Sequence, residues 1–261
     1  MKKIESKENN FFKNVKKLKE KRTRKKENKY IIEGFRFVEE AIKSKAKIDS
    51  IIISESVLDK ALEYFDLLGD FECYVFSDNL FNQICSTENP QGVASIINME
   101  NEDLKINGDF FILVDRVQDP GNMGTIIRTS HAAGANGVIL TKGTVDVYND
   151  KTLRSTMGSI FKVPIIEDDN GEFLLSLKNN GFRLVASSLE GKNNFFEEDL
   201  KGKIIIAVGN EGNGISEDVE NDADALVKIP MPGNAESLNV SVAASIMIYE
   251  KIRQNIISSI E

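Results

Sequence analysis

The chain has 261 residues, of which 41% are hydrophobic and 28% charged, so it can fold as two domains and bury a substantial core. No apolar run approaches the length of a membrane span, and the basic N-terminus lacks the apolar stretch of a signal peptide; we therefore expect a cytoplasmic protein. Two cysteines and one histidine supply neither a zinc site nor a disulfide framework, and we expect no metal.

The charge is divided unevenly along the chain. The net charge is −8, but residues 1–29 hold 13 Lys and Arg against four Asp and Glu, which leaves 20 against 37 in the remainder. A basic arm on an acidic body is typical of a protein with a polyanionic partner, although a solvated helix face has the same composition. Within this arm Phe11, Phe12, Val15 and Leu18 recur at helical spacing, which predicts a short amphipathic helix.

Strands and helices alternate in residues 30–98 and again in residues 110–261. The first part predicts a small α/β domain, and residues 99–109, which are polar and without periodicity, predict a linker. The second part opens with Phe110–Asp115, an apolar run typical of a parallel strand that is buried on both faces. Further strands are predicted at Gly137–Thr141, Leu184–Ser187, Lys203–Gly209 and Leu226–Pro230, with a helix between the second and third of these and a long helix from about 239 to 254.

Three segments at predicted strand ends are rich in glycine, asparagine and isolated charges. In a parallel α/β sheet, ligands bind beyond the carboxyl ends of the strands. The first segment covers residues 115–128. Asn122 is suited to cap the helix that follows, and Arg128 could present donors to a phosphate or hydroxyl oxygen. A plain strand–turn–helix junction with a surface arginine would have the same sequence pattern.

The second and third segments cover residues 208–215 and 229–243. The glycines at 209, 212 and 214 match neither the dinucleotide fingerprint nor a Walker loop, and they suggest a tight loop whose backbone a planar ligand can approach. Glu211 is a lone carboxylate in this loop. As an alternative to a catalytic role, it could stabilise the loop by accepting hydrogen bonds from backbone N–H groups. In the third segment, Ser237 or Asn239 is a good N-cap for the last helix.

In order and spacing, these segments resemble the three motifs of the SpoU/TrmH-type RNA ribose methyltransferases of the SPOUT class. Arg154, Ser155, Gly158 and Pro164 fit the intermediate segment of that family, and the N-terminal region resembles the substrate-binding domain of many members. The resemblance therefore covers nearly the whole chain. The matching motifs are Asn122-x-Gly124 with Arg128, Gly209-x-Glu211-Gly212, and Ile229-Pro230-Met231 with Ser237-Leu238-Asn239-Val240-Ser241.

The resemblance implies transfer of a methyl group from S-adenosylmethionine (SAM) to a ribose 2′-hydroxyl of structured RNA. It divides the chain into a basic arm (1–29), an RNA substrate-binding α/β domain (30–98), a linker (99–109) and a SPOUT α/β catalytic domain with a C-terminal trefoil knot (110–261). Gly209, Ile229 and Leu238 are implied to bind the cofactor. The implied catalytic residues are Asn122, Arg128, Glu211, Ser237 and Asn239.

Members of the family are homodimers, and the last helix, with Val240, Ala244, Ile248 and Ile252 at helical spacing, offers a dimer face or else an intramolecular core face. A separate substrate domain favours ribosomal RNA over transfer RNA. A non-catalytic RNA-binding protein would be expected to lack Arg128, Glu211 or Asn239, and the missing fingerprint argues against a Rossmann-type nucleotide enzyme. His131 is interpreted as a helix-surface residue.

Overall fold

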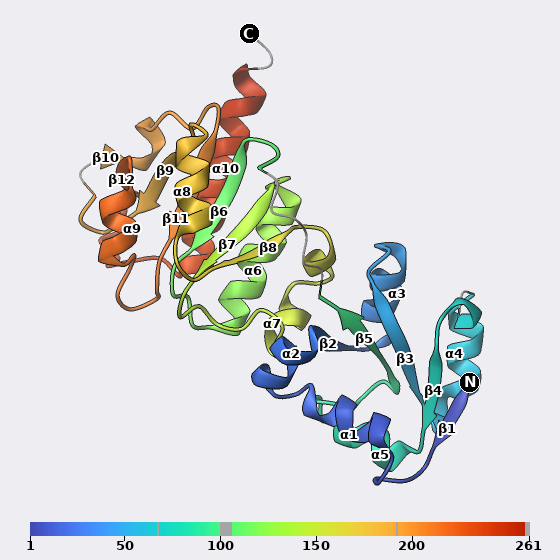
Figure 1. The fold of residues 1–261 in the computed structure, drawn as a ribbon. Helices are drawn as coiled ribbons and strands as arrows, with labels where there is room; N and C mark the ends of the chain where they lie inside the picture. Colours follow the sequence, from blue (N-terminus) through green and yellow to red (C-terminus); the bar gives the residue numbers. More distant parts are fainter. Residues whose placement is uncertain (67, 100–105, 192, 259–261) are drawn as a thin grey trace. The chain divides into compact units, whose positions relative to one another are not determined.

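The computed structural model describes residues 1–66, 68–99, 106–191 and 193–258. The chain divides into two compact units, which are described separately (Figure 1). The N-terminal unit consists of Met1–Asn101 and Tyr148–Arg154, and the C-terminal unit of Glu102–Val147 and Ser155–Glu261. Of the predicted linker 99–109, residues 100–105 lie outside the described residues. No helix in the described ranges is both long and apolar enough to cross a membrane.

The N-terminal unit is built on a mixed sheet with the strand order β1-β4-β3-β5-β2. Strands β1, β4 and β3 are parallel, whereas β5 pairs antiparallel with β3 and β2. Helices α1 and α5 pack on one face of this sheet, and α3 and α4 lie against the strands as well. The elements are β1 (Lys2–Ile4), α1 (Asn10–Lys17), α2 (Lys21–Glu27), β2 (Lys29–Glu33), α3 (Phe35–Lys43), β3 (Ile48–Ser54), α4 (Leu58–Tyr64), β4 (Cys73–Phe76), α5 (Asp78–Ile84) and β5 (Val93–Asn98).

The basic residues 1–29 form part of this folded unit. The predicted amphipathic helix is confirmed as α1, which begins where the Asn9 side chain accepts the backbone N–H of Phe11 at 2.8 Å. Phe12, Val15 and Leu18 are buried in the same core as Phe76 and Phe81. The guanidinium of Arg24 is buried too and donates to the carbonyl oxygens of Leu18 and Lys19 at 2.8 and 2.7 Å, which closes the end of α1 and fixes α2 against it.

The C-terminal unit is built on a seven-stranded sheet, all parallel in its described part, with the order β10-β12-β9-β11-β6-β7-β8. The near-continuous apolar strands are buried on both faces, as expected for such a sheet. The elements are β6 (Phe110–Val114), α6 (Pro120–Ala132), β7 (Gly137–Thr141), β8 (Ile165–Asp168), α8 (Glu172–Asn179), β9 (Arg183–Ser187), β10 (Asn193–Asn194), β11 (Ile204–Val208), α9 (Glu217–Asp222), β12 (Ala225–Lys228) and α10 (Val240–Ser258). Helix α7 (Asp150–Ser155) belongs, except for its last residue, to the N-terminal unit.

Helices cover both faces of this sheet (Figure 1). On one face, the apolar side chains of α8 and α9 pack in one core with Phe111, Leu113 and Ile205. Alternate strand residues point to the other face, where α10 packs against both α6 and β11. The chain therefore returns from β12, near one edge of the sheet, to its centre.

This unit differs from the sequence prediction in one helix that is absent from the described residues and in two elements that were not predicted. No α-helix lies between β9 and β11 in the described residues: Asn194 accepts the N–H of Phe196 at 3.1 Å and holds only a 3₁₀ turn over Phe195–Glu197. Strand β8 and helix α8 were not predicted. For α10 the sequence left open a dimer face and an intramolecular core face; Val240, Ala244 and Ile248 are buried in their own chain, which supports the core face for these three residues.

Candidate functional site: three loops at the carboxyl edge of the sheet

The first two loops leave the sheet side by side. Strands β6 and β11 are parallel neighbours with Val114 opposite Val208, so the chain leaves both strands at the same level. The third loop follows β12, and α10 then returns beside α6, where Thr129 Oγ1 lies 3.2 Å from Ser245 Oγ. Three segments that are distant in sequence thus meet at one edge of the sheet, where parallel α/β folds place their ligands.

The first loop ends at a cap that differs from the predicted one. Helix α6 begins with Pro120, and its N-cap is Asp119, whose Oδ1 accepts the backbone N–H of Asn122 at 2.8 Å. The prediction that Asn122 caps this helix is therefore wrong. Because Asp119 accepts the free N–H at the start of the helix, the Asn122 side chain is available for contacts with the other two loops.

Hydrogen bonds of Asn122 join all three loops. Its Nδ2 donates to Glu211 Oε1 at 3.1 Å, and its Oδ1 accepts from Asn239 Nδ2 at 2.9 Å. Asn239 in turn accepts the backbone N–H of Ser241 at 2.9 Å and its hydroxyl at 2.7 Å, which confirms Asn239 as the N-cap of the last helix. Glu211, Asn122 and Asn239 form a chain of polar contacts, called here the three-loop relay.

Glu211 also holds the backbone of the first loop. Its two carboxylate oxygens accept the N–H groups of Gln118 at 3.1 Å and Asp119 at 3.0 Å. Partial burial acts to raise the pKa of Glu211, but hydrogen bonds from Asn122 and from backbone N–H groups outweigh it and hold this pKa below its ordinary value. Glu211 is therefore ionised at neutral pH and serves as a hydrogen-bond acceptor, which is the structural alternative inferred from the sequence.

The second loop closes on itself. Asn210 and Gly214 exchange two backbone hydrogen bonds of 2.8 and 2.9 Å. A Cβ at position 209 would lie 2.1 Å from the carbonyl carbon of Gly214 and 2.2 Å from the backbone N of Ile215. The closure of the loop itself therefore requires glycine at position 209. From the sequence, this glycine was explained only by the close approach of a ligand.

The remaining candidate residues lie outside the three-loop relay. Arg128 is exposed on α6, six residues beyond Asn122, and makes no hydrogen bond or ion pair with any residue that the structure describes. Ser237 is exposed, Leu238 is half-buried and Ile229 is buried at the start of the third loop. His131 is exposed, as interpreted from the sequence, with Nδ1 3.1 Å from Ser159 Oγ.

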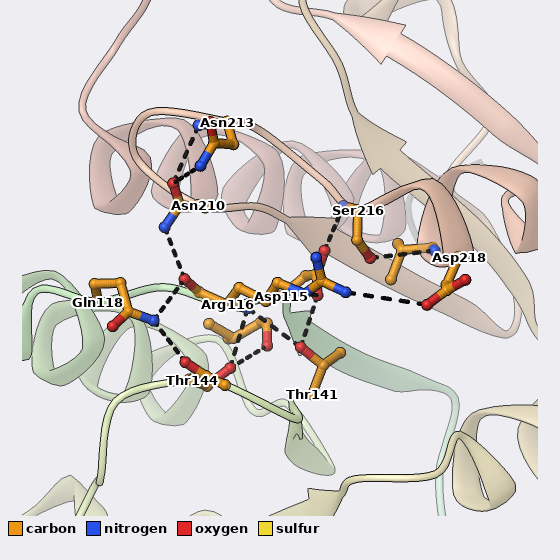
Figure 2. A network of polar contacts seen from close by, with 12 residues as sticks. Asp115, Arg116, Gln118, Thr141, Thr144, Asn210, Asn213, Ser216 and Asp218 are labelled. Carbon is orange, nitrogen blue, oxygen red and sulfur yellow. Dashed lines mark hydrogen bonds and ion pairs between the residues drawn. The ribbon is translucent and has the colours of Figure 1, made fainter.

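Sequence reasoning did not single out the polar network around Asp115 and Arg116 (Figure 2). Asp115 is buried, and Arg116 has a left-handed backbone with φ of 56°. The carbonyl of Arg116 accepts from Asn210 Nδ2 at 2.9 Å, so this network also joins the first loop to the second. A signal was present in the sequence: Asp115 ends a run of five apolar residues, and a carboxyl group there needs buried hydrogen-bond donors.

The described residues contain no group of three or more His, Cys, Asp or Glu side chains placed to hold a metal ion.

Comparison with known proteins identifies this arrangement. Residues 109–249 match the SpoU rRNA Methylase family, and residues 9–95 match the MRM3-like substrate binding domain. The chain is 38% identical to the 23S rRNA (guanosine(2553)-2′-O)-methyltransferase RlmP of Bacillus subtilis over 95% of this chain and 98% of that protein.

Solved structures give the same result. The AdoMet-bound rRNA methyltransferase from Sinorhizobium meliloti has a TM-score of 0.84 and 32% identity, with 97% of both chains covered. The SpoU methyltransferase AviRb from Streptomyces viridochromogenes, in complex with AdoMet, has a TM-score of 0.85 and 28% identity, with 95% of this chain and 98% of that chain covered.

These loops and matches define a class of enzyme, the SAM-dependent RNA 2′-O-ribose methyltransferases. Within this class, the chain belongs to the SpoU rRNA methylase family. The resemblance inferred from the three motifs is confirmed, as are the activity and the cofactor that it implied.

Proposed function

We propose that this enzyme methylates a ribose 2′-hydroxyl of ribosomal RNA, with the three-loop relay as the frame of its active site. The observation that carries the proposal is the hydrogen-bonded chain from Glu211 through Asn122 to Asn239, which brings the three motif loops together. The names of relatives support the choice of RNA: RlmP is named for 23S rRNA, and so is a Streptomyces viridochromogenes enzyme that is 35% identical over 65% of this chain.

The cofactor site is proposed at the second and third loops, and the residues there fit SAM. The second loop, closed by Asn210 and Gly214, offers its backbone, and Ile229 and Leu238 on the third loop offer apolar side chains for a planar base. When bound, SAM supplies a methyl group that its sulfonium has already activated. The protein's task is to hold the RNA 2′-oxygen in line with that methyl group and to offset the charge that develops on the oxygen.

Arg128, Asn122 and Ser237 are proposed to act on the RNA side. The guanidinium of Arg128 stays protonated in proteins, so we assign it to clamp an adjacent phosphate and to stabilise the developing alkoxide. One Asn122 N–H is engaged by Glu211, and the second hydrogen of that amide remains for the ribose. Ser237, exposed on the third loop, is placed to contact the same nucleotide. Glu211 and Asn239 orient Asn122.

The division of labour along the chain is proposed as follows. Residues 30–98 form the RNA substrate-binding domain, with the basic residues 1–29 supplying phosphate contacts, and residues 110–261 form the catalytic SPOUT domain. The return of α10 from β12 to the centre of the sheet supports a C-terminal trefoil knot as in the family. We further propose a homodimer in the cytoplasm, and no metal cofactor.

The test is methyl transfer from labelled SAM to purified ribosomal RNA and, separately, to purified transfer RNA. Ribose methylation is then mapped in RNA from cells with and without the gene. The proposal expects one ribosomal ribose that loses its 2′-O-methyl group in the deletion strain. Methylation of transfer RNA alone would overturn the choice of substrate, and transfer to a base instead of a ribose would overturn the proposed reaction.

A further inference from the structure

Asp115 is a buried carboxyl group at the point where β6 ends, and it joins neighbouring strands to the second loop (Figure 2). Its side chain is 1% exposed. Oδ1 accepts the hydroxyl of Thr141, the last residue of β7, at 2.6 Å, and Oδ2 accepts the backbone N–H of Ser216 at 2.6 Å. Its own N–H donates to the carbonyl of Val208, the last residue of β11, at 2.9 Å.

The bond to Ser216 fixes the return end of the second loop. Asn210 and Gly214 close this loop by two backbone hydrogen bonds, so its position on the sheet depends on the bonds that it makes to its surroundings. Asn210 Nδ2 holds the outgoing end through the carbonyl of Arg116, and Glu211 holds the tip. Asp115 is the buried member of this set of anchors, and hydrogen bonds to a buried carboxyl group are short and strong.

Asp115 also orients the first loop through Thr141. The Thr141 hydroxyl donates to Asp115, which leaves its oxygen lone pairs to accept the N–H of Arg116 at 3.2 Å; Thr144 Oγ1 accepts the same N–H at 3.1 Å. Arg116 is held in a left-handed backbone conformation that a side-chain-bearing residue adopts only when its surroundings impose it. The direction in which the first loop leaves β6 therefore depends on the same carboxyl group.

We infer that Asp115 is a positioning residue for the methyl-donor site, which sets the backbone of the second loop against SAM by holding Ser216 and Thr141. The inference rests on the proposed placement of SAM at that loop. At 1% exposure, Asp115 has no surface with which to touch a ligand, so it acts through the residues that it holds.

The test is the dissociation constant of SAM, measured by calorimetry, for the wild-type protein and for Asp115→Asn. The amide keeps the shape of the carboxyl group but has only one acceptor oxygen. If that oxygen accepts the N–H of Ser216, which cannot reverse its role, the amide nitrogen faces Thr141, and the Thr141 hydroxyl loses its acceptor. We expect SAM to bind about tenfold more weakly. Thr141→Val should weaken SAM binding in the same direction, whereas Thr141→Ser, which keeps the hydroxyl, should restore it.

Asp168→Asn is the matched control. Asp168 also ends a strand of this sheet and is 7% exposed, but it accepts the backbone N–H groups of Phe173 at 3.1 Å and Leu174 at 2.9 Å, at the start of α8. This variant should lower the melting temperature while SAM affinity stays within about twofold of wild type.

The outcomes separate the two proposals. If Asp115→Asn lowers the melting temperature as Asp168→Asn does, but both bind SAM like the wild type, Asp115 has only a structural role and the inference is overturned. Equal SAM affinity in Thr141→Val and Thr141→Ser would overturn it as well, even where Asp115→Asn does not fold. If the wild-type protein itself binds no SAM, the proposed cofactor site fails, and the inference fails with it.

Discussion

At the scale of single residues, the site is built from side chains whose polar ends are already engaged by the protein. Asn122 gives one amide hydrogen to Glu211 and accepts from Asn239, so its plane is fixed before any RNA arrives. A prepositioned amide costs less to order when substrate binds, and this favours catalysis. Arg128 differs from these residues, because no described residue holds its guanidinium, so it is free to bind an anion.

The first prediction concerns Arg128. Arg128→Ala should lower methyl transfer about 100-fold or more, because the phosphate clamp and the stabilisation of the developing alkoxide are lost together. SAM affinity should stay near that of wild type, since the second and third loops are untouched. Arg128→Lys keeps the charge but loses the planar set of donors and should recover little activity. The measurements are single-turnover methylation and calorimetry with SAM; a parallel loss of SAM affinity would place Arg128 on the cofactor side instead.

The second prediction concerns pH and Glu211. Its pKa in the folded protein lies below the ordinary value of 4.5, so its stabilising effect is fully present above about pH 4.5 and is lost as the pH falls through the folded-state pKa. Glu211→Gln should therefore melt below the wild type at pH 7, and the difference should shrink below pH 4.5. Thermal melts across this range measure it, with the exposed Glu190→Gln as a control that should melt like the wild type throughout. A difference that does not change with pH would contradict the ionic role of Glu211.

At the scale of elements, the basic N-terminal segment combines buried core residues with exposed cations that are proposed to contact RNA. Ile4, Phe12, Val15 and Leu18 are core residues of the N-terminal unit, each contributing about 1.5–3 kcal/mol by burial. Removing residues 1–27 would therefore cost stability as well as charge. Neutralising selected cations is the cleaner test of RNA binding.

The third prediction uses such a charge variant. Lys17, Lys21 and Arg22 are exposed at the end of α1 and the start of α2, and they make no ion pair with described residues. Changing all three to Gln should weaken RNA binding and flatten its dependence on log salt by about three units or less. A control variant of equal charge changes Lys2, Lys3 and Lys13, which are already paired with Glu72, Glu5 and Glu8, and should weaken binding less. Equal losses in both variants would mean that net charge alone matters, without a local binding surface.

Element prediction succeeded where a pattern was long or complete. The apolar runs of β6 and β11 and the amphipathic stripe of α1 were predicted correctly. A strand that is buried on both faces has a continuous apolar run, and a helix that is buried on one side has apolar residues at intervals of three and four. Element prediction failed for β8, whose four residues include Glu167 and Asp168. It also failed for the segment after β9, where the Asn194 side chain accepts a backbone N–H and holds a single turn. These outcomes depend on local hydrogen bonds that hydrophobic spacing does not encode.

At the scale of the whole molecule, the motifs predicted which loops form the site but not how they connect. Glu211 and Asn122 are 89 positions apart in sequence, and Asn122 and Asn239 are 117 apart. No spacing rule links them, and only the parallel pairing of β6 with β11 and the return of α10 bring them together. The sequence left the buried face of α10 undecided for a similar reason: apolar residues lie on several sides of this helix, so their spacing does not reveal which side meets the sheet.

The exposed apolar side of α10 leads to the last prediction. Val242, Tyr249 and Ile256 follow one another at intervals of seven residues and are 47%, 51% and 56% exposed, so they form one stripe along the helix. Such a stripe on a helix surface is typical of an interface, and the proposed homodimer would bury it against a second copy. Tyr249→Glu should therefore sediment as a monomer, whereas the wild type should sediment as a dimer at micromolar concentration.

The matched control is Leu175→Glu, since Leu175 is 60% exposed on α8, whose buried residues pack on the other face of the sheet. That variant should remain dimeric and active. The family resemblance implies an active site at the dimer interface, so the Tyr249→Glu monomer is expected to lose methyl transfer while its fold, measured by thermal melting, persists. A wild-type protein that sediments as a monomer, or a fully dimeric Tyr249→Glu, would show that the stripe does not hold two copies together.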